Sequence, residues 1–138
     1  MNIQSYGGTM EKKEYTKLSK KRLKNSFKFA IQGIKSALKT EQNLKIHFIV
    51  TALVVILGIV LKINFTEWAI CFLLFGFVIT AELLNTAIEV TVDLAMPDIN
   101  EKAKLAKDIA AGAVLVSSIV AILIGLAIFL PKIIELIF

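Results

Sequence analysis

The sequence predicts an all-α integral membrane protein, with one N-terminal amphipathic surface helix followed by three transmembrane helices. Hydrophobic residues make up 57% of its 138 residues, above the roughly 45–50% that is usual in soluble domains. Three long runs, at about 44–61, 68–92 and 105–130, carry few charges, and each is close to the length that a helix needs to cross a bilayer. We therefore expect a single membrane domain over residues 20–138, after a polar leader at 1–19.

The segment 20–39 combines apolar and basic positions with the period of a helix. Its apolar residues recur at intervals of three and four, and its lysines occupy the other face. The apolar set is Leu23, Phe27, Ala30, Ile31, Ile34 and Leu38, and the basic set is Lys21, Lys24, Lys28, Lys35 and Lys39. This pattern predicts a basic helix lying in the headgroup plane of a membrane. The alternative is a soluble amphipathic helix that packs on a core.

The first span is predicted at 44–61 and is short. Lys45 and His47 lie at its start, where a long side chain can reach back to the interface. The segment 62–67 reads as a tight turn, with Thr66 as the expected N-cap of the next helix. We interpret His47 as an interface residue in preference to a metal ligand.

The second span is predicted at 68–92, with Trp68 as an anchor at the membrane interface. A polar loop is expected at 94–104, and the third span at 105–130. Pro131 is expected to end that span, because proline cannot continue the backbone hydrogen bonding of a helix. The one cysteine of the chain lies within the second span, so it reads as a small buried hydrophobic residue.

The lysines and the arginine predict the topology. Positions 1–45 carry eleven of these sixteen residues and the loop at 94–107 carries three, whereas only Lys62 and Lys132 lie on the other side. This bias predicts a multi-pass protein of the inner (cytoplasmic) membrane, with a cytoplasmic N-terminus and a C-terminus outside. No short apolar segment with a cleavage site follows the first lysines, so we expect no removable signal peptide.

A polar stripe interrupts the second span. Glu82, Asn85, Glu89 and Asp93 follow one another at offsets of 0, 3, 7 and 11, which places them on one face of a helix. A carboxylate at membrane depth costs about 2.5–3.5 kcal/mol on insertion scales. Three of them on one face need a compensating partner, and a divalent cation is the obvious one. The stripe is therefore the candidate active site.

Further charged residues are expected at the same cytoplasmic boundary as the stripe. They lie in the turn before the first span and at the start of the third span: Glu41, Lys107 and Asp108. Cytoplasm supplies ATP and magnesium, and the membrane supplies a lipid. A site between the two phases suits transfer from a soluble donor to a lipid headgroup.

Each of these residues has a chemical role and a plainer alternative. Glu41 and Glu89 form a candidate pair for Mg²⁺, which takes one or two carboxylates together with phosphate oxygens and waters, although Glu41 alone reads as a solvated loop residue. Glu82 lies deeper, and a carboxylate in a low-dielectric site gains affinity for a proton, which suits a general base. Otherwise Glu82 is a trapped acid bonded to a neighbouring helix. Lys107 and Asp108 could neutralise and orient nucleotide phosphates, or simply begin a helix.

The sequence lacks the signatures of other nucleotide and metal sites. It has no G-x-x-x-x-G-K-[ST] phosphate loop and no kinase-type glycine loop, so neither soluble ATP-binding fold is expected. A single histidine and a single cysteine do not support a zinc site. No nucleic-acid partner is expected.

Two motifs closely resemble the small bacterial diacylglycerol kinase family, which includes the undecaprenol kinases of Gram-positive bacteria. The first is Ala81-Glu82-Leu83-Leu84-Asn85-Thr86-Ala87-Ile88-Glu89 with Asp93, and the second is Lys107-Asp108 with Ala110-Ala111-Gly112-Ala113-Val114-Leu115. The resemblance covers about residues 22–130. It implies a homotrimer with sites shared between subunits, which transfers the γ-phosphate of ATP to a lipid hydroxyl with Mg²⁺.

The resemblance also implies roles for single residues. Glu82 matches the family's proposed general base, Glu41 and Glu89 match its metal-binding glutamates, and Asn85 matches an asparagine between them that we assign to the lipid site. Arg22 matches an arginine near both nucleotide and lipid. The nucleotide-contacting positions match Arg22, Phe29, Glu41, Glu89, Asp98, Asn100, Lys107 and Asp108. Phe29 and Asn100 depart from the family, which has a tyrosine and a histidine at these positions in the diacylglycerol enzyme.

The lipid acceptor expected from the resemblance is undecaprenol. The segment 41–47 looks more like the Gram-positive branch, whereas the diacylglycerol branch has a more acidic end here. Diacylglycerol kinase is the alternative within the family. Two alternatives of another class are an ion or proton carrier that uses the acidic stripe, and a non-enzymatic assembly factor whose basic helix binds anionic lipids. The clustering of the acids at one end of the span argues against both.

Overall fold

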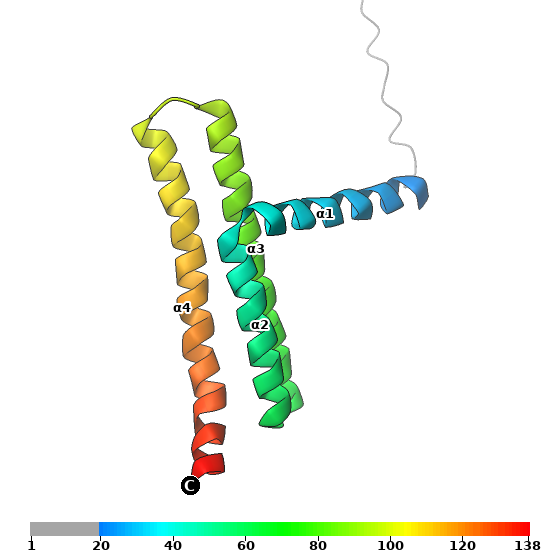
Figure 1. Ribbon diagram of the computed structural model, residues 1–138, viewed down its shortest axis with the longest axis vertical. Helices are drawn as coiled ribbons and strands as arrows, with labels where there is room; N and C mark the ends of the chain where they lie inside the picture. Colours follow the sequence, from blue (N-terminus) through cyan, green and yellow to red (C-terminus); the bar gives the residue numbers. More distant parts are fainter. Residues whose placement is uncertain (1–19) are drawn as a thin grey trace, which may run out of the picture. The chain divides into compact units, whose positions relative to one another are not determined.

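The computed structural model describes residues 20–138, and within them the chain forms four helices (Figure 1). These are α1 (Lys20–Thr40), α2 (Gln42–Val60), α3 (Phe65–Ala95) and α4 (Glu101–Ile137). The chain divides into two compact units after Gln32, so the boundary falls inside α1. The predicted leader at 1–19 lies outside the described residues.

The predicted fold class is confirmed in its main features. The described residues are all-helical, and three of the helices, α2, α3 and α4, are long and apolar enough to cross a membrane. A helix is also present where the surface helix was predicted, although its position on a membrane stays a prediction. Large apolar side chains are exposed along α2, α3 and α4. Soluble monomers rarely expose apolar patches of this extent, so lipid is the environment that suits these helices.

Glu41 separates α1 from α2. Its backbone is extended, with φ −93° and ψ 118°, and it is the N-cap residue of α2. The last turn of α1 leaves carbonyl groups without partners inside the helix. Nζ of Lys45 donates a hydrogen bond to one of them, the carbonyl of Lys39, at 3.2 Å. The side chain that was expected to reach back to the interface thus bonds the last turn of the preceding helix.

The connection between α2 and α3 corrects the predicted cap. Asn64, and not Thr66, is the N-cap of α3: its side chain accepts a hydrogen bond from the Glu67 N–H at 3.0 Å, and Glu67 accepts one from the Asn64 N–H at 2.7 Å. This reciprocal capping box satisfies two donors that the first turn would leave open. Thr66 lies in the first turn instead, because an asparagine followed three residues later by a glutamate is the stronger start signal.

The packing beside this connection requires a glycine at position 58, in the last turn of α2. A Cβ atom on Gly58 would lie 2.9 Å from Cη2 of Trp68 and 3.0 Å from Cδ1 of Ile63. Trp68 therefore packs directly over the α2 backbone, where only a glycine leaves room. Lys62, in the turn, has φ 52°, a left-handed conformation that non-glycine residues adopt rarely.

Helix α4 is longer than predicted at both ends. It begins at Glu101, which shortens the expected polar loop to residues 96–100, and it continues through Pro131 to Ile137. The prediction that Pro131 ends the helix is therefore wrong. Proline inside a helix removes one hydrogen bond, but membrane helices tolerate it because local adjustments satisfy the freed carbonyl. Just beyond it, Nζ of Lys132 lies 3.2 Å from Oε2 of Glu67 and ties α4 to the start of α3.

Helix α3 packs against both α2 and α4, which run alongside it (Figure 1). The small core includes Ile63, Cys71 and Phe129, with Trp68 and Phe75 packed against it. Cys71 is free and buried, as predicted for a small hydrophobic residue. Beyond this core, the face of α3 that follows Cys71 and Val78 leads to the polar stripe.

Candidate functional site

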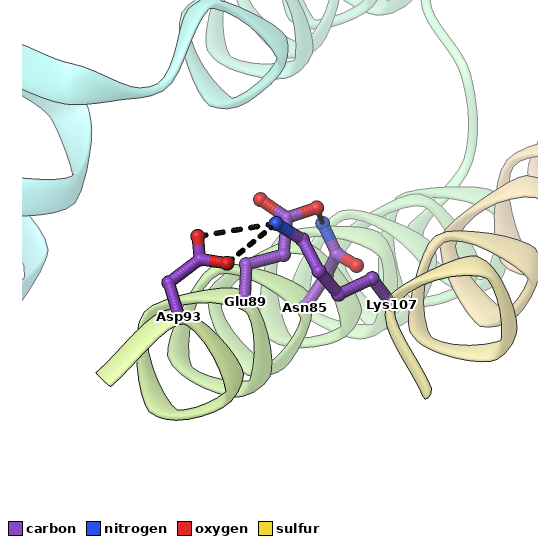
Figure 2. A network of polar contacts seen from close by, with 4 residues as sticks. All are labelled: Asn85, Glu89, Asp93 and Lys107. Carbon is purple, nitrogen blue, oxygen red and sulfur yellow. Dashed lines mark hydrogen bonds and ion pairs between the residues drawn. The ribbon is translucent and has the colours of Figure 1, made fainter. Parts of the chain in front are cut away.

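The polar stripe passes from the interior of the packed helices to solvent along α3. Glu82 is 2% exposed and Asn85 7% exposed, whereas Glu89 is half-buried and Asp93 is exposed. Figure 2 shows Asn85, Glu89 and Asp93 following one another on this helix, with Lys107 reaching toward them from α4. The helix repeat places the acids on one face, and the packing against α2 and α4 buries only the deeper ones.

The buried part of the stripe is incompletely hydrogen-bonded. Asn85 donates a hydrogen bond from Nδ2 to Oε1 of Glu89 at 3.1 Å. Within residues 20–138, neither Oδ1 of Asn85 nor Oε2 of Glu82 has a hydrogen-bond partner, although both atoms are buried. A buried polar atom without a partner costs about 1–3 kcal/mol. Such atoms suit a site that a substrate group, a water or a proton completes.

Lys107 joins α4 to the outer end of the stripe. Its Nζ donates to both carboxylate oxygens of Asp93, at 2.9 and 3.1 Å. The side chains are 36% and 65% exposed, so solvent screens this pair and it contributes little to stability. Sequence reasoning did not find this pair, because it needs to know that α3 and α4 are antiparallel neighbours. Asp108 follows Lys107 on α4 and is exposed.

Glu41 and His47 bring α2 into the site. Glu41 is half-buried, and its Oε1 accepts a hydrogen bond from the Thr40 hydroxyl at 2.9 Å. His47, Glu89 and Glu41 all lie within electrostatic range of the Glu82 carboxyl. The predicted acids Glu41 and Glu89 therefore both act electrostatically on Glu82.

The donor set fits a metal ion only if other ligands complete it. Within residues 20–138, no group of three or more His, Cys, Asp or Glu side chains lies close enough to hold a metal. Glu41 and Glu89 each use one carboxylate oxygen in the hydrogen bonds above and keep the other for a further ligand. Mg²⁺ is commonly bound by one or two carboxylates, with substrate phosphates and waters in the remaining positions. The residues present fit that mode of binding.

The remaining predicted nucleotide contacts lie in two places. Asn100 is the N-cap of α4, and its Oδ1 accepts hydrogen bonds from the N–H groups of Lys102 at 2.9 Å and Ala103 at 3.2 Å. Asp98 is exposed in the connection between α3 and α4. Arg22 and Phe29 belong to the first compact unit, on α1, where Phe29 is 64% exposed.

A cavity that sequence reasoning missed lies between α2, α3 and α4. Its volume is about 450 Å³. It extends from His47 on α2 to Ile133 on α4, and its lining is apolar apart from His47, Thr51 and Ser118. Helix periodicity predicts which face of a helix is apolar, but it does not say whether neighbouring side chains fill the space between helices.

Comparison with known proteins gives a family and two curated relatives. The sequence model of the prokaryotic diacylglycerol kinase family matches residues 28–129. The undecaprenol kinase of Bacillus subtilis is 47% identical over 107 residues, which cover 78% of this chain and 87% of the relative. The diacylglycerol kinase of Synechocystis is 38% identical over 112 residues, which cover 80% of this chain and 64% of the relative.

Proposed function

This chain belongs to the prokaryotic diacylglycerol kinase family, and from that premise we propose that it phosphorylates undecaprenol with ATP. The products would be undecaprenyl phosphate and ADP. The observation that carries the choice of acceptor is the 47% identity to an undecaprenol kinase over 87% of that relative's length. Diacylglycerol is the second candidate acceptor, because a diacylglycerol kinase is 38% identical to this chain.

Glu82 is the proposed general base. Its Oε2 is buried and has no hydrogen-bond partner within residues 20–138, so it can accept a hydrogen bond from a lipid hydroxyl. As the proton passes to Oε2, the alcohol oxygen forms a bond to the γ-phosphorus. The bond from that phosphorus to the bridging oxygen breaks, and ADP leaves with the electron pair. Such transfers depend mainly on positioning and electrostatic stabilisation.

Glu41 and Glu89 are the residues proposed to hold Mg²⁺. When bound, Mg²⁺ would neutralise charge on the ATP phosphates. Asn85 supports this assignment, because its hydrogen bond to Oε1 of Glu89 fixes the orientation of that carboxylate. Asn85 also keeps an unpartnered Oδ1 for a substrate group.

The proposed nucleotide contacts continue toward the exposed end of the stripe. Lys107 would bind phosphate oxygens, with Asp93 holding its ammonium group in place at 2.9 Å. Asn100 uses its side-chain oxygen to cap α4, so Nδ2 is the side-chain atom that remains available to a nucleotide. Arg22, Phe29, Asp98 and Asp108 are proposed as further contacts on the strength of the family motifs.

We also propose the membrane setting and the assembly. The distribution of lysines favours an inner-membrane protein with a cytoplasmic N-terminus and with the connection between α3 and α4 on the same side. The homotrimer is implied by the family resemblance. The absence of a three-ligand cluster within the described part of one chain is compatible with sites that are completed by a neighbouring subunit and by the nucleotide.

The test is a phosphotransfer assay with purified protein in detergent. With γ-labelled ATP, undecaprenol and diacylglycerol are offered side by side, and we expect label in the undecaprenol product at the higher kcat/KM. A higher kcat/KM for diacylglycerol would select the second candidate. Ion flux without ATP consumption, measured in liposomes, would favour an ion carrier and contradict the kinase assignment.

A further inference from the structure

The joint between α1 and α2 holds the backbone of Glu41 in place. Glu41 is the one residue between the two helices, which end at Thr40 and begin at Gln42. Its N–H donates a hydrogen bond to the carbonyl of Ala37 at 2.8 Å. Ala37 and Leu44, on either side of it in the chain, are 7% and 0% exposed. Because buried side chains anchor the joint on both sides, the direction of the Glu41 carboxylate depends on its side-chain torsions.

The Glu41 side chain does not cap the helix that follows it. Glu41 is the N-cap residue of α2, yet it makes no side-chain hydrogen bond to the first turn. Asn64 and Asn100, the N-cap residues of α3 and α4, both make such bonds. Serine, threonine, aspartate and asparagine are preferred at this position, because their side-chain oxygen reaches the N–H groups of the first turn. The glutamate at this position therefore keeps its carboxylate for another partner.

The lysine one turn further on does not neutralise this carboxylate. Lys45 follows Glu41 by four residues, a spacing at which glutamate and lysine commonly pair on a helix. Its Nζ instead donates to the carbonyl of Lys39 at 3.2 Å. Lys45 therefore leaves the negative charge of Glu41 to another cation.

The hydroxyl group of Thr40 orients the Glu41 carboxylate. Oγ1 of Thr40 lies 2.9 Å from Oε1 of Glu41, closer than it lies to the carbonyl oxygens of Ser36 and Ala37, each 3.4 Å away. A hydroxyl group has one proton to donate, and the shorter bond to a charged acceptor is the stronger one. This bond holds Oε1 and leaves Oε2 of Glu41 for a metal ion.

Glu89, the other glutamate proposed to hold Mg²⁺, is oriented in the same manner. Nδ2 of Asn85 donates to its Oε1 at 3.1 Å. In both glutamates a neutral side chain holds one carboxylate oxygen. A neutral donor orients a carboxylate without cancelling the charge that attracts a cation, whereas a lysine or an arginine would cancel it. Hydrogen-bond partners of this kind orient metal ligands and raise metal affinity.

We propose that Thr40 is a positioning residue of the magnesium site, which directs the Glu41 carboxylate toward the cation through its hydroxyl group. This inference rests on the proposed function, in which Glu41 holds Mg²⁺, and adds the residue that prepares this ligand. Thr40 acts through Glu41, as Asn85 acts through Glu89. Thr40 is exposed whereas Asn85 is buried, so water replaces part of the Thr40 hydrogen bond when the hydroxyl group is removed.

Three variants isolate the contribution of the hydroxyl group. Thr40→Val keeps the branched shape of the side chain without the hydroxyl group, and Thr40→Ser keeps the hydroxyl group. Thr91→Val is the matched control: Thr91 is exposed, and its hydroxyl group donates to the backbone carbonyl of Ala87 at 2.7 Å. It reports the effect of losing a helix threonine that does not bond a carboxylate. Thr40→Ala gives the same comparison should Thr40→Val fail to fold.

The readout is metal binding, which does not depend on catalysis. Mn²⁺ replaces Mg²⁺ and is titrated into the full-length protein in detergent at a saturating concentration of adenylyl imidodiphosphate, a non-hydrolysable ATP analogue. Water-proton relaxation distinguishes Mn²⁺ on the protein from Mn²⁺ on the free nucleotide, because the protein–detergent complex tumbles more slowly. We expect the apparent Kd for Mn²⁺ to rise about three- to tenfold in Thr40→Val, below the 10–100-fold range for most such partners, because Thr40 is exposed.

The other variants and the kinase assay complete the test. Thr40→Ser and Thr91→Val should bind Mn²⁺ within about twofold of wild type. In the kinase assay, Thr40→Val should raise the Mg²⁺ concentration for half-maximal activity, with the KM for undecaprenol unchanged. An unchanged Kd in Thr40→Val, or an equal rise in Thr40→Val and Thr40→Ser, would overturn the positioning role. If wild type binds Mn²⁺ with the analogue but phosphorylates no alcohol, the proposed function fails and the Kd comparison still decides the role of Thr40.

Discussion

At the scale of single residues, the two glutamates of the stripe on α3 differ in burial and in hydrogen bonding. Glu82 is 2% exposed, yet its Oε2 has no partner within residues 20–138. Glu89, seven residues on, is half-buried and already bonded to Asn85. The same residue type thus meets two environments on one helix. An open buried oxygen suits proton transfer, whereas an oriented and partly solvated carboxylate suits a cation.

Replacement of Glu82 tests the proton transfer. Glu82→Gln keeps the shape of the side chain but cannot accept the proton, so we expect kcat to fall by about 10²–10⁴-fold, with the KM for ATP within about twofold of the wild-type value. The measurement is initial-rate kinetics with undecaprenol. Glu135→Gln, an exposed change near the end of α4, is the matched control and should be neutral. Near-normal turnover in Glu82→Gln would remove the base assignment.

Replacement of Glu89 tests the cation site. Glu89→Gln keeps an oxygen that can accept from Asn85 but loses the negative charge, so we expect the Mg²⁺ concentration for half-maximal activity to rise about tenfold or more. The measurement is a magnesium titration at saturating ATP. Glu101→Gln, an exposed change in the first turn of α4, should leave the titration unchanged. A superimposable titration in Glu89→Gln would contradict the metal role.

The sequence predicts those features of the site that depend on helix periodicity alone. Spacing alone places Glu82, Asn85 and Glu89 on one face, because the repeat of a helix is fixed. It could not reveal that Lys107 pairs with Asp93, since that contact joins positions fourteen residues apart across a connection. Nor could the spacing show that Oδ1 of Asn85 has no hydrogen-bond partner within residues 20–138, because that depends on which side chains pack around it.

At the scale of elements, the start of α3 follows the usual sequence rule for a helix end, whereas the end of α4 does not. The capping box of Asn64 and Glu67 follows the ordinary start signal, because the first turn of α3 must satisfy its own N–H groups in any solvent. The stop signal at Pro131 fails. The proline removes one backbone hydrogen bond, and the residues on either side of it continue to bond along the helix. Helix α4 therefore extends to Ile137.

The joint between α2 and α3 makes a prediction about stability. Gly58→Ala places a Cβ atom 2.9 Å from Trp68 and 3.0 Å from Ile63, so the tryptophan must shift, at a cost of about 1–3 kcal/mol. Gly76→Ala is the matched control, because a Cβ atom there meets nothing within 4 Å. Thermal unfolding in detergent should show a lower Tm for Gly58→Ala alone. Equal Tm values for the two variants would contradict the close packing over Gly58.

At the scale of the whole molecule, two ion pairs mark the ends of the α3–α4 pair. Glu67 and Lys132 meet at one end, and Asp93 and Lys107 meet at the other. The intervals are 26 residues on α3 and 25 on α4, or about 38–39 Å of helix. A hydrocarbon core is about 30 Å thick. If both pairs lie just outside it, Glu82, fifteen residues and about 22 Å from Glu67, lies inside the core, and Glu89 lies at its boundary.

This placement makes a prediction about sidedness, which follows from the charges at the two ends. Fourteen of the sixteen lysine and arginine residues lie in 1–45 and 94–107, and the positive-inside rule places those segments in the cytoplasm. The one native cysteine, Cys71, is buried and gives a low background for thiol labelling. Asp98→Cys should therefore react with an impermeant maleimide only after the inner face is opened.

Glu135→Cys, at the other end of α4, supplies the opposite arm of the same experiment. Intact cells should label it directly, because the C-terminal turn of α4 would lie outside. The α3–α4 connection lies at the end of the molecule where Asp93 and Lys107 meet, so its sidedness also fixes where the nucleotide must arrive. Direct labelling of Asp98→Cys in intact cells would place that end outside, away from cytoplasmic ATP, and the kinase mechanism drawn on this stripe would then have no phosphate donor.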